Sequence, residues 1–328
     1  MRVLVTGASG FVARHLIRAL AGQEIMGPSG VRGPVDELVL ADVVEPRAPS
    51  DGPWRRIRVE TGDFADPAFV ARLTADGHDS IFHLAAALTI DAEADFRRGL
   101  EVNVLGFVHL LEACRAMVRP PRLVFASSIA AFGGPLPAVV DDHLAQTPQT
   151  SYGTHKSIAE LLLNDYSRRG FVDARALRLP VVLTRPGSPT PAVSDRIASI
   201  LREPLMGRDV VCPLSISTRI PVSSVQRVAA ALLALHDLPA AALGHTRALN
   251  LPSLTVSIGE MIDAVRRAGP GRPIGRIEVA PDPGLQAVVD GWPSAFVSER
   301  ASAVGIRADA SIDEVVGALL ADLASTDG

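Results

Sequence analysis

Two residues able to perform proton chemistry stand four positions apart in the segment Tyr152-Gly-Thr-His-Lys156. Residues with this spacing lie on the same face of a helix, one turn from each other. A tyrosine has an ordinary pKa of about 10 and is a poor base at neutral pH. A nearby ammonium group favours the phenolate and so lowers that pKa. The spacing therefore predicts that Tyr152 is a general base and that Lys156 lowers its pKa.

Lys156 is the only lysine in the chain, and Tyr152 is one of two tyrosines. Arginine, which supplies all the other Lys/Arg positions, is nearly impossible to deprotonate, whereas lysine carries a compact ammonium on a flexible stem. We expect a chain this poor in lysine to use one where arginine would fail. Taken alone, the motif also fits an incidental Tyr/Lys pair on a surface helix.

Hydroxyl groups are predicted near this pair, because the apolar run Leu123-Val-Phe-Ala126 ends in Ser127-Ser128. A serine at the carboxyl edge of a parallel sheet can hydrogen-bond the reacting oxygen as a hydroxyl becomes a carbonyl. Paired serines are also ordinary turn formers, so the Tyr/Lys pair is what favours the catalytic interpretation.

A glycine turn, Thr6-Gly-Ala-Ser-Gly-Phe-Val-Ala13, follows the apolar run Val3-Leu-Val5 and opens a helical pattern. Here Gly7 permits a tight turn, Gly10 lets the backbone approach a pyrophosphate, and Ala13 lets the helix pack closely on the strand. The phosphates of a dinucleotide would rest on the amino end of that helix. The letters alone also fit a structural turn, but their place in a βαβ unit indicates a dinucleotide site.

Acidic residues follow the next strands. Asp42 ends the run Leu38-Val-Leu-Ala-Asp42 and could accept hydrogen bonds from ribose hydroxyls, or it could cap a turn. Its charge would repel a 2′-phosphate, so NAD is favoured over NADP. Asp63 could meet the adenine amino group. His83 lies in an apolar run and is expected to be a hydrogen-bonded core residue with no role as acid or base.

Apolar runs of strand length alternate with helical periodicity through the first 180 residues, which predicts an α/β fold with a Rossmann-type, doubly wound parallel sheet. The same pattern predicts residues 1–180 as an NAD-binding domain with the catalytic residues and 181–328 mainly as a smaller substrate-binding lobe. Residues 27–36 are expected to be a surface loop and the proline-rich residues 185–191 an irregular connection. The strands are expected near 2–6, 37–42, 57–60, 80–84, 122–127 and 174–180, and the helices near 10–23, 67–75, 92–118, 151–169, 192–203, 224–236, 257–267 and 311–323.

Composition narrows the function class. The net charge is only -4 and no run of like charges occurs, so no nucleic acid or anionic membrane surface is implied. Cys114 and Cys212 lack any metal-ligand spacing, which predicts no metal site and no disulfide framework. The chain opens directly on a strand pattern, without a signal peptide or an apolar run long enough to span a membrane. We therefore expect a cytoplasmic protein.

With these residues in place, the chain resembles the extended short-chain dehydrogenases of the NAD-dependent epimerase/dehydratase family. The shared motifs occur in order: the glycine turn, His83-Leu-Ala-Ala86, Asn103-Val-Leu-Gly106, the serine pair and the YxxxK motif. The family places its catalytic serine four residues before an aromatic-glycine pair, here Phe132-Gly133, which selects Ser128. It also uses the lysine to hold the nicotinamide ribose, and its members are usually dimers, which implies a homodimer here.

This resemblance and the turn geometry together give a set of expected cofactor contacts. Besides the acidic residues and the catalytic pair, they come from the glycine turn, from the segments after the third and fourth expected strands, from the Asn-Val segment and from the turn after the sixth strand. The expected NAD-binding residues are Gly7, Ser9, Gly10, Phe11, Val12, Asp42, Asp63, Phe64, Leu84, Ala85, Ala86, Asn103, Tyr152, Lys156, Pro180 and Val182.

Within the family, the chain is most similar to a group that oxidises the C2 hydroxyl of a four-carbon sugar acid with NAD. The similar segments include Phe132-Gly-Gly-Pro-Leu-Pro137 and Thr147-Pro-Gln-Thr-Ser-Tyr-Gly153. The resemblance implies a small hydroxy-acid substrate, and a carboxylate of this kind needs a cationic or amide partner. Arg219 and Ser127 are the candidate substrate residues, although a solvated surface position fits Arg219 equally well. Around residues 188–191 and 219–222 the sequence departs from that group.

Two other functions are compatible with the scaffold. A nucleotide-sugar epimerase would convert its substrate without net NADH formation. Dehydratases of this type carry an acidic pair after the catalytic hydroxyl, whereas Ser128 is followed by Ile129-Ala130. A non-catalytic NAD-binding regulatory protein would have no need of the Ser/Tyr/Lys set.

Overall fold

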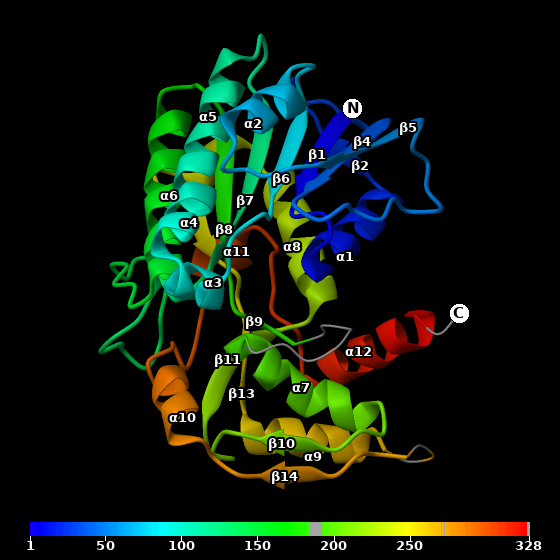
Figure 1. The fold of residues 1–328 in the computed structure, drawn as a ribbon, viewed down its shortest axis with the longest axis vertical. Coiled ribbons are helices and arrows are strands. Elements are labelled where there is room, and N and C mark those ends of the chain that lie inside the picture. The colour runs from blue at the N-terminus through cyan, green and yellow to red at the C-terminus, as the bar shows by residue number, and fades with distance from the viewer. Residues whose placement is uncertain (184–191, 270, 272, 327–328) are drawn as a thin grey trace. The chain divides into compact units, whose positions relative to one another are not determined.

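The computed structural model describes residues 1–183, 192–269, 271 and 273–326 (Figure 1). The chain folds into two compact units. The first comprises Met1–Ala131, Pro148–Arg178 and Ala229–Leu249, and the second comprises Phe132–Thr147, Leu179–Val228 and Asn250–Gly328. Residues 185–191, which were expected to form an irregular connection, lie outside the described residues.

The first unit is built on a seven-stranded sheet in the order β12-β8-β7-β6-β1-β4-β5. The pairs β4-β5, β1-β4, β1-β6 and β6-β7 are parallel. From β1 the chain first builds outward through β4 and β5, then crosses to β6 on the other side of β1, which confirms the doubly wound sheet. The strands are β1 Arg2–Thr6, β4 Glu37–Asp42, β5 Arg56–Thr61, β6 Ser80–His83, β7 Arg122–Ser128, β8 Asp173–Leu179 and β12 Ala248–Asn250.

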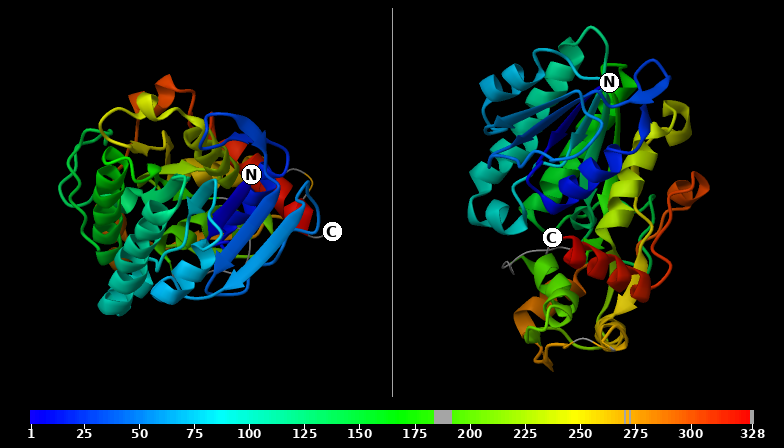
Figure 2. Two further views of the ribbon diagram at one scale, coloured as in Figure 1. Left: turned by 90° about the horizontal axis from the view of Figure 1, so that it is seen from above. Right: turned by 90° about the vertical axis from the view of Figure 1, so that its right-hand side faces the viewer.

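Helices cover both faces of this sheet (Figures 1 and 2). On one face lie α2 Pro67–Thr74, α5 Gly106–Ala116 and α6 Ser151–Arg168, and on the other lie α1 Phe11–Leu20 and the end of α8 Val225–Asp237. Apolar side chains alternate between the faces: Leu4 and Phe125 pack in the core under α5, together with Phe107 and Leu163. Expected helices match α1 Phe11–Leu20, α2 Pro67–Thr74, α6 Ser151–Arg168 and α8 Val225–Asp237.

The single helix expected over 92–118 is wrong, because the segment is broken. It forms α3 Thr89–Ala94, α4 Phe96–Leu100, the π-helical turn η1 Glu101–Leu105 and α5 Gly106–Ala116. Asp95 interrupts the first helix with non-helical backbone angles, and its carboxylate caps α4 by accepting from the Arg98 N–H. Gly106 lets α5 begin close to the backbone of Phe64, since a Cβ there would lie 2.7 Å from the Phe64 carbonyl oxygen.

The expected surface loop over 27–36 is also corrected. Its second half pairs with the preceding residues as a short antiparallel ribbon of β2 Glu24–Met26 and β3 Arg32–Pro34. The turn between them includes Gly30 with a φ of 78°, a conformation that favours glycine. Two three-residue strands around a Gly/Pro-rich turn give too weak an alternation to be recognised in sequence.

The second unit contains a three-stranded sheet, β13-β11-β9, and a two-stranded parallel pair, β10-β14. Its core is formed by buried residues of α7 and α9, such as Ile200 and Met261, with apolar residues of the strands and of α12. Its elements are β9 Val181–Val182, α7 Val193–Leu205, β10 Val210–Cys212, β11 Arg219–Ser223, β13 Leu254–Ser257, α9 Ile258–Arg267, β14 Ile277–Val279, α10 Pro283–Asp290, α11 Glu299–Ala303 and α12 Ile312–Thr326. Over the described residues, no helix is both long and apolar enough to cross a membrane.

Candidate active site

The glycine turn joins β1 to α1 at the carboxyl edge of the sheet. Gly7 has a φ of 66°, and a Cβ at this position would lie 2.7 Å from the Ala85 nitrogen, so only glycine fits. The Gly10 N–H donates to the Gly7 carbonyl at 2.9 Å, which closes the turn. No side chain caps α1 at Gly10. The first turn of α1 also holds no acidic residue, so the positive end of its dipole suits the binding of a pyrophosphate.

Asp42 braces this turn from the end of β4. One carboxylate oxygen accepts from the Ser9 N–H at 2.9 Å, and the other accepts from the Val43 N–H at 2.7 Å. The Ser9 hydroxyl donates to the Val44 carbonyl at 3.0 Å. The side chain is half-buried beside the glycine turn. The oxygen bound by Val43 also accepts from the Val44 N–H at 3.3 Å, so the oxygen bound by Ser9 is the one with a further lone pair for a ribose hydroxyl. Asp42 therefore has both of the roles that the sequence left open: turn cap and candidate ribose ligand.

The segment after β6 lies against the same turn. The Thr6 hydroxyl accepts from the Leu84 and Ala85 N–H groups, each at 3.2 Å, and it hydrogen-bonds His83 Nδ1 at 2.8 Å. Leu84, Ala85 and the neighbouring Ala86 are half-buried. His83 is buried and stacks on aromatic rings, and burial lowers its pKa to about 3. His83 is therefore neutral at physiological pH, in agreement with its expected place in the core.

Asn103 ties this segment to the helices. Its amide donates to the Ala87 carbonyl at 2.9 Å and accepts from the Ala87 N–H at 2.8 Å, and its nitrogen lies 3.3 Å from His155 Nδ1. Asp63 pairs with Arg98 at 2.7 Å, and Phe64 is buried in the core. Both residues thus have protein partners, and Asp63 is still partly exposed.

Gly153 explains how α6 brings Tyr152 close to the end of β7. A Cβ at Gly153 would lie 2.0 Å from the Ala130 carbonyl oxygen, so the helix can approach this turn only with glycine there. Thr150 caps α6, since its hydroxyl accepts from the Gly153 N–H at 3.1 Å. The Tyr152 side chain is consequently close enough to Ser128 for that hydroxyl to favour the phenolate.

Lys156 lies one turn further along α6 and is 3% exposed. Its Nζ donates to the Ala126 carbonyl at 2.7 Å and lies 4.4 Å from the centre of the Phe125 ring and 5.4 Å from that of Tyr152. Burial of the ammonium lowers its pKa to about 7, and the Glu160 carboxylate opposes this shift. The structure thus brings together Ser128, Tyr152 and Lys156, as their spacing predicted.

The expected lowering of the Tyr152 pKa by Lys156 is not found in the protein alone. Burial raises the Tyr152 pKa to about 12, and the hydrogen bond with Ser128 only partly offsets this. The physical reason is that desolvation penalises a buried phenolate, while the lysine that should stabilise it is itself desolvated beside the Phe125 ring.

The two serines at the end of β7 point to opposite faces because side chains alternate along a strand. Ser128 faces Tyr152 and accepts from the Ala130 N–H at 3.1 Å. Ser127 is buried, and its hydroxyl donates to Glu160 at 2.5 Å. Glu160 also pairs with Arg178 at 2.8 Å. Sequence reasoning missed both of these charged residues; the available signal was Glu160, four positions after Lys156.

Three expected site residues belong to the second unit. Val182 pairs with Ser223 in the β9-β11 ladder, and the buried Pro180 directly precedes β9. Arg219 is exposed at the start of β11 and donates weakly to the Thr255 carbonyl at 3.5 Å. It lines a cavity of about 460 Å³ with Ser215, Ser217, Thr218, Gln286, Val289, Asp290, Trp292 and Ser294.

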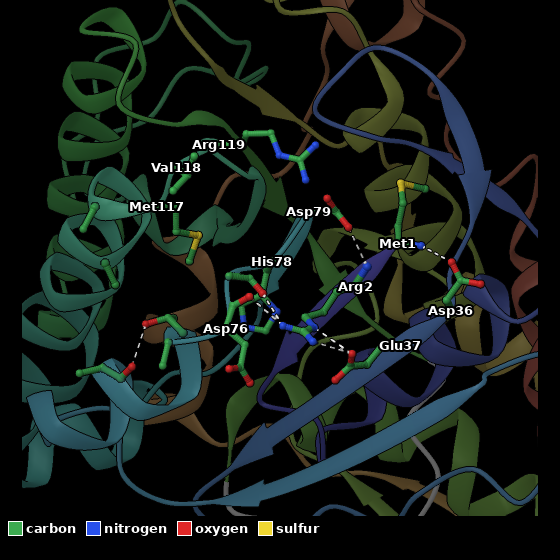
Figure 3. A pocket seen from close by; sticks show the side chains of 16 residues that line it. Met1, Arg2, Asp36, Glu37, Asp76, His78, Asp79, Met117, Val118 and Arg119 are labelled. Atoms are coloured by element: carbon green, nitrogen blue, oxygen red, sulfur yellow. Dashed lines mark hydrogen bonds and ion pairs between the residues drawn. The ribbon is translucent and has the colours of Figure 1, made fainter.

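A larger cavity, of about 800 Å³, lies at the opposite, amino-terminal edge of the sheet (Figure 3). Several of its charged groups are paired with one another, Arg2 with Glu37 at 2.9 Å and the amino terminus with Asp36 at 2.6 Å. Ligands of open α/β sheets bind at the carboxyl ends of the strands, where the glycine turn and Tyr152 lie. We therefore assign the candidate active site to the carboxyl edge.

Comparison with known proteins agrees with this site. Residues 3–250 match the model of the NAD dependent epimerase/dehydratase family. The chain belongs to this family, NAD is its cofactor, and the expectation of an NAD-dependent oxidoreductase is confirmed. The glycine turn, the uncapped end of α1 and the placement of Asp42 fit that cofactor.

Particular relatives narrow the class further. The chain is 42% identical to a D-erythronate dehydrogenase from Cupriavidus necator over 98% of both chains. It is 37% identical to a D-erythronate dehydrogenase from Haemophilus influenzae, over 96% of this chain and 98% of the relative. A crystal structure described as a nucleoside-diphosphate-sugar epimerase from Agrobacterium tumefaciens superimposes with a TM-score of 0.93 at 36% identity, covering 99% of this chain and 95% of the other.

Proposed function

We propose that this chain oxidises the C2 hydroxyl of a small sugar acid, D-erythronate or a close analogue, to the 2-keto acid with reduction of NAD. Two relatives that match nearly the full length are named for that substrate. The observation that carries the chemistry is that Tyr152 lies beside Ser128 and one helical turn from the buried Lys156, whose Nζ is 5.4 Å from the centre of the Tyr152 ring. This is a hydroxyl pair positioned to bind one substrate oxygen.

In the proposed reaction, the Tyr152 oxygen takes the proton of the C2 hydroxyl while Ser128 donates a hydrogen bond to the oxygen that becomes the carbonyl. When bound, NAD accepts the hydride that leaves C2. One proton and one hydride thus leave the alcohol, which balances its oxidation to a ketone. Because burial holds the Tyr152 pKa at about 12 in the protein alone, the phenolate needs a positive charge beside it, and Lys156 is placed to provide this. We also propose that Lys156 holds the nicotinamide ribose.

Replacing Tyr152 by phenylalanine tests this mechanism. The variant removes only the hydroxyl, so we expect NAD reduction to fall about 10³-fold while NAD binding is retained. Turnover is followed by NADH absorbance and binding by calorimetry. Unchanged turnover in Tyr152→Phe would overturn the assignment.

The substrate class is tested by incubating the protein and NAD with four- to six-carbon sugar acids, including D-erythronate. Net NADH formation supports oxidation. The rival, a nucleotide-sugar epimerase, is favoured by the name of the similar solved structure, and it would show as conversion of a nucleotide sugar without NADH accumulation. A regulatory protein would bind NAD and turn over neither type of substrate.

Arg219 is our candidate for holding the substrate carboxylate, and we propose the second unit as the source of substrate contacts. The exposed guanidinium of Arg219 lines a cavity that also contains the hydroxyl groups of Ser215, Ser217 and Thr218. Arg219→Met should raise the KM for the acid about tenfold or more with little change in NAD affinity. An unchanged KM would leave Arg219 a surface residue.

We also propose that the protein is a cytoplasmic homodimer. Large apolar side chains are exposed on the helical side of the first unit, at Phe96, Leu105 and Leu161. Such exposure favours an interface between copies of the chain. Both cysteines are free and buried, which suits a reducing compartment. Light scattering that gave a monomer mass would contradict the dimer, and fractionation of the native cells tests the location.

A further inference from the structure

Glu160 is a buried carboxylate on the same helix as the catalytic pair. It lies four residues after Lys156, so both side chains leave one face of α6. Glu160 is 2% exposed. A buried charge is unfavourable unless other groups pair with it and hydrogen-bond it.

Two neighbouring strands supply such partners. From β8, Arg178 Nε donates to both carboxylate oxygens, at 3.0 and 3.1 Å, and Arg178 Nη2 donates to Oε2 at 2.8 Å. From β7, the Ser127 hydroxyl donates to Oε1 at 2.5 Å. Charge-assisted bonds of this kind are among the stronger hydrogen bonds in proteins. The carboxylate is thus fixed in position.

The Ser127 bond connects this carboxylate to the catalytic groups. Ser127 stands between Ala126, whose carbonyl accepts from Lys156 Nζ, and Ser128, whose hydroxyl meets Tyr152. The bond that holds Ser127 therefore fixes the backbone that positions the Ala126 carbonyl and the Ser128 hydroxyl. The carboxylate also acts on Lys156 through its charge.

We propose, on the basis of the function proposed above, that Glu160 is a positioning residue for hydride transfer. It keeps Lys156 charged and, through Ser127, holds the end of β7 in position beside Tyr152. Arg178 orients the carboxylate and moderates its charge. Glu160 touches neither substrate nor cofactor in this proposal; it acts through Lys156 and Ser127.

Among the charged and titratable groups around Lys156, Glu160 is the one that stabilises its charged form. On α6 these are Tyr152 and His155; on β6 the neighbour is His83, and on β8 Arg178 lies behind Glu160. Burial lowers the pKa values of both histidines, so neither contributes a charge at neutral pH. Burial also lowers the Lys156 pKa to about 7, and the Glu160 charge raises it.

The single lysine makes the test direct. Protein labelled with ¹⁵N- and ¹³C-lysine gives one side-chain NMR signal, whose pH titration reports the Lys156 pKa without substrate or turnover. We compare the full-length wild type with Glu160→Gln and Arg178→Gln. Both variants break the same ion pair, so a merely structural role changes both alike. The proposal instead requires opposite shifts: a Lys156 pKa lower by about one pH unit in Glu160→Gln and higher in Arg178→Gln.

Ser127→Ala is the third variant, because it leaves the ion pair intact and is the least disruptive to folding. It should reduce kcat severalfold with little change in the KM for NAD and without moving the lysine titration. Equal or absent titration shifts in the two ion-pair variants would overturn the charge role. An unchanged kcat in Ser127→Ala would overturn the anchoring role, and it alone decides that part if the ion-pair variants do not fold. Failure of the proposed function would appear separately, as an active Tyr152→Phe.

Discussion

The two ends of the central sheet bury positive charge in different ways. At the amino ends of β7 and β8, the guanidinium groups of Arg122 and Arg175 lie against the last carbonyls of α8. Near the carboxyl end of β7, the ammonium of Lys156 lies against aromatic rings. Arg175 Nη1 donates to the His236 and Leu238 carbonyls, each at 2.7 Å, and Arg175 Nη2 pairs with Asp173 at 2.5 Å. Arg122 donates to the same two carbonyls. These cations complement the negative end of the helix dipole.

Lys156 is held quite differently. It donates to one carbonyl, of Ala126, and otherwise faces the Phe125 and Tyr152 rings. Burial lowers the pKa of both kinds of cation, but Asp173 offsets the shift of Arg175 directly, while Glu160 offsets that of Lys156 without a hydrogen bond of its own to Nζ. The comparison teaches that one end of the sheet uses buried charge for stability and the other retains it for chemistry.

The sharpest way to break this comparison is Lys156→Met. We expect kcat to fall about 10²- to 10⁴-fold, because Tyr152 loses the charge that supports its phenolate. We also expect the free energy of unfolding at pH 7 to rise by about 2 kcal/mol, because an apolar side chain of similar length replaces a desolvated ammonium. Initial rates and urea unfolding measure the two effects.

The size of this stability effect depends on pH. The folded pKa of Lys156 is about 7 and its ordinary value is 10.5, so between these values the unfolded chain binds a proton that the folded chain does not. The free energy of unfolding of the wild type therefore rises with pH in this window, and the advantage of the methionine variant shrinks. A methionine variant that is less stable than the wild type at pH 7 would contradict the contrast.

The opposite outcome is expected for Arg175→Met. Its removal takes a fully buried donor from Asp173, which keeps Arg247, and from the carbonyls at the end of α8, which keep Arg122. We expect the free energy of unfolding to fall by about 3 kcal/mol, with kcat of the folded enzyme unchanged. Arg168→Met is the matched control, because that arginine is exposed on α6 and pairs only at the surface. A stable Arg175→Met protein with impaired kcat would show that this end of the sheet also takes part in the chemistry.

Local patterns explain how much of the site was predictable. The Tyr152/Lys156 pair depends on the geometry of one helical turn, and the glycine turn depends on one strand-to-helix connection, so local spacing together with the βαβ pattern around it predicted both. The alternation of strands and helices likewise predicted the sheet from β1 to β8. The last strand, β12, escaped prediction because three residues carry no recognisable alternation.

What sequence could not supply depends on contacts between distant segments. Ser127 and Glu160 are 33 residues apart, and Glu160 and Arg178 are 18 apart, so only the packing of α6 on β7 and β8 brings them together. The error in the Tyr152 pKa has the same origin. Spacing showed that a lysine lies nearby, but it could not show how far both groups are removed from water.

Two buried histidines offer a smaller test of the same comparison, since His83 ends β6 and His236 lies at the other end of the sheet. The pKa of His83 is about 3 in the folded chain against an ordinary value of 6.5, so below pH 6.5 the unfolded chain binds the proton first. The free energy of unfolding should then fall by up to about 1.4 kcal/mol per pH unit from this residue. Burial lowers the pKa of His236 as well, and the charges of Arg175 and Arg122 add to this, but His236 differs in having the Asp237 carboxylate at 2.8 Å, which opposes the shift.

Asparagine at either position removes the titration while keeping a polar side chain. Urea unfolding at about pH 6 and about pH 4 gives the slope for each variant. His83→Asn should flatten the acid loss of stability more than His236→Asn does, because only His236 has a carboxylate to stabilise its charged form. Equal flattening by the two variants would mean that Asp237 does not stabilise the charged form of His236. The amino end of the sheet would then compensate a buried charge no better than the carboxyl end does.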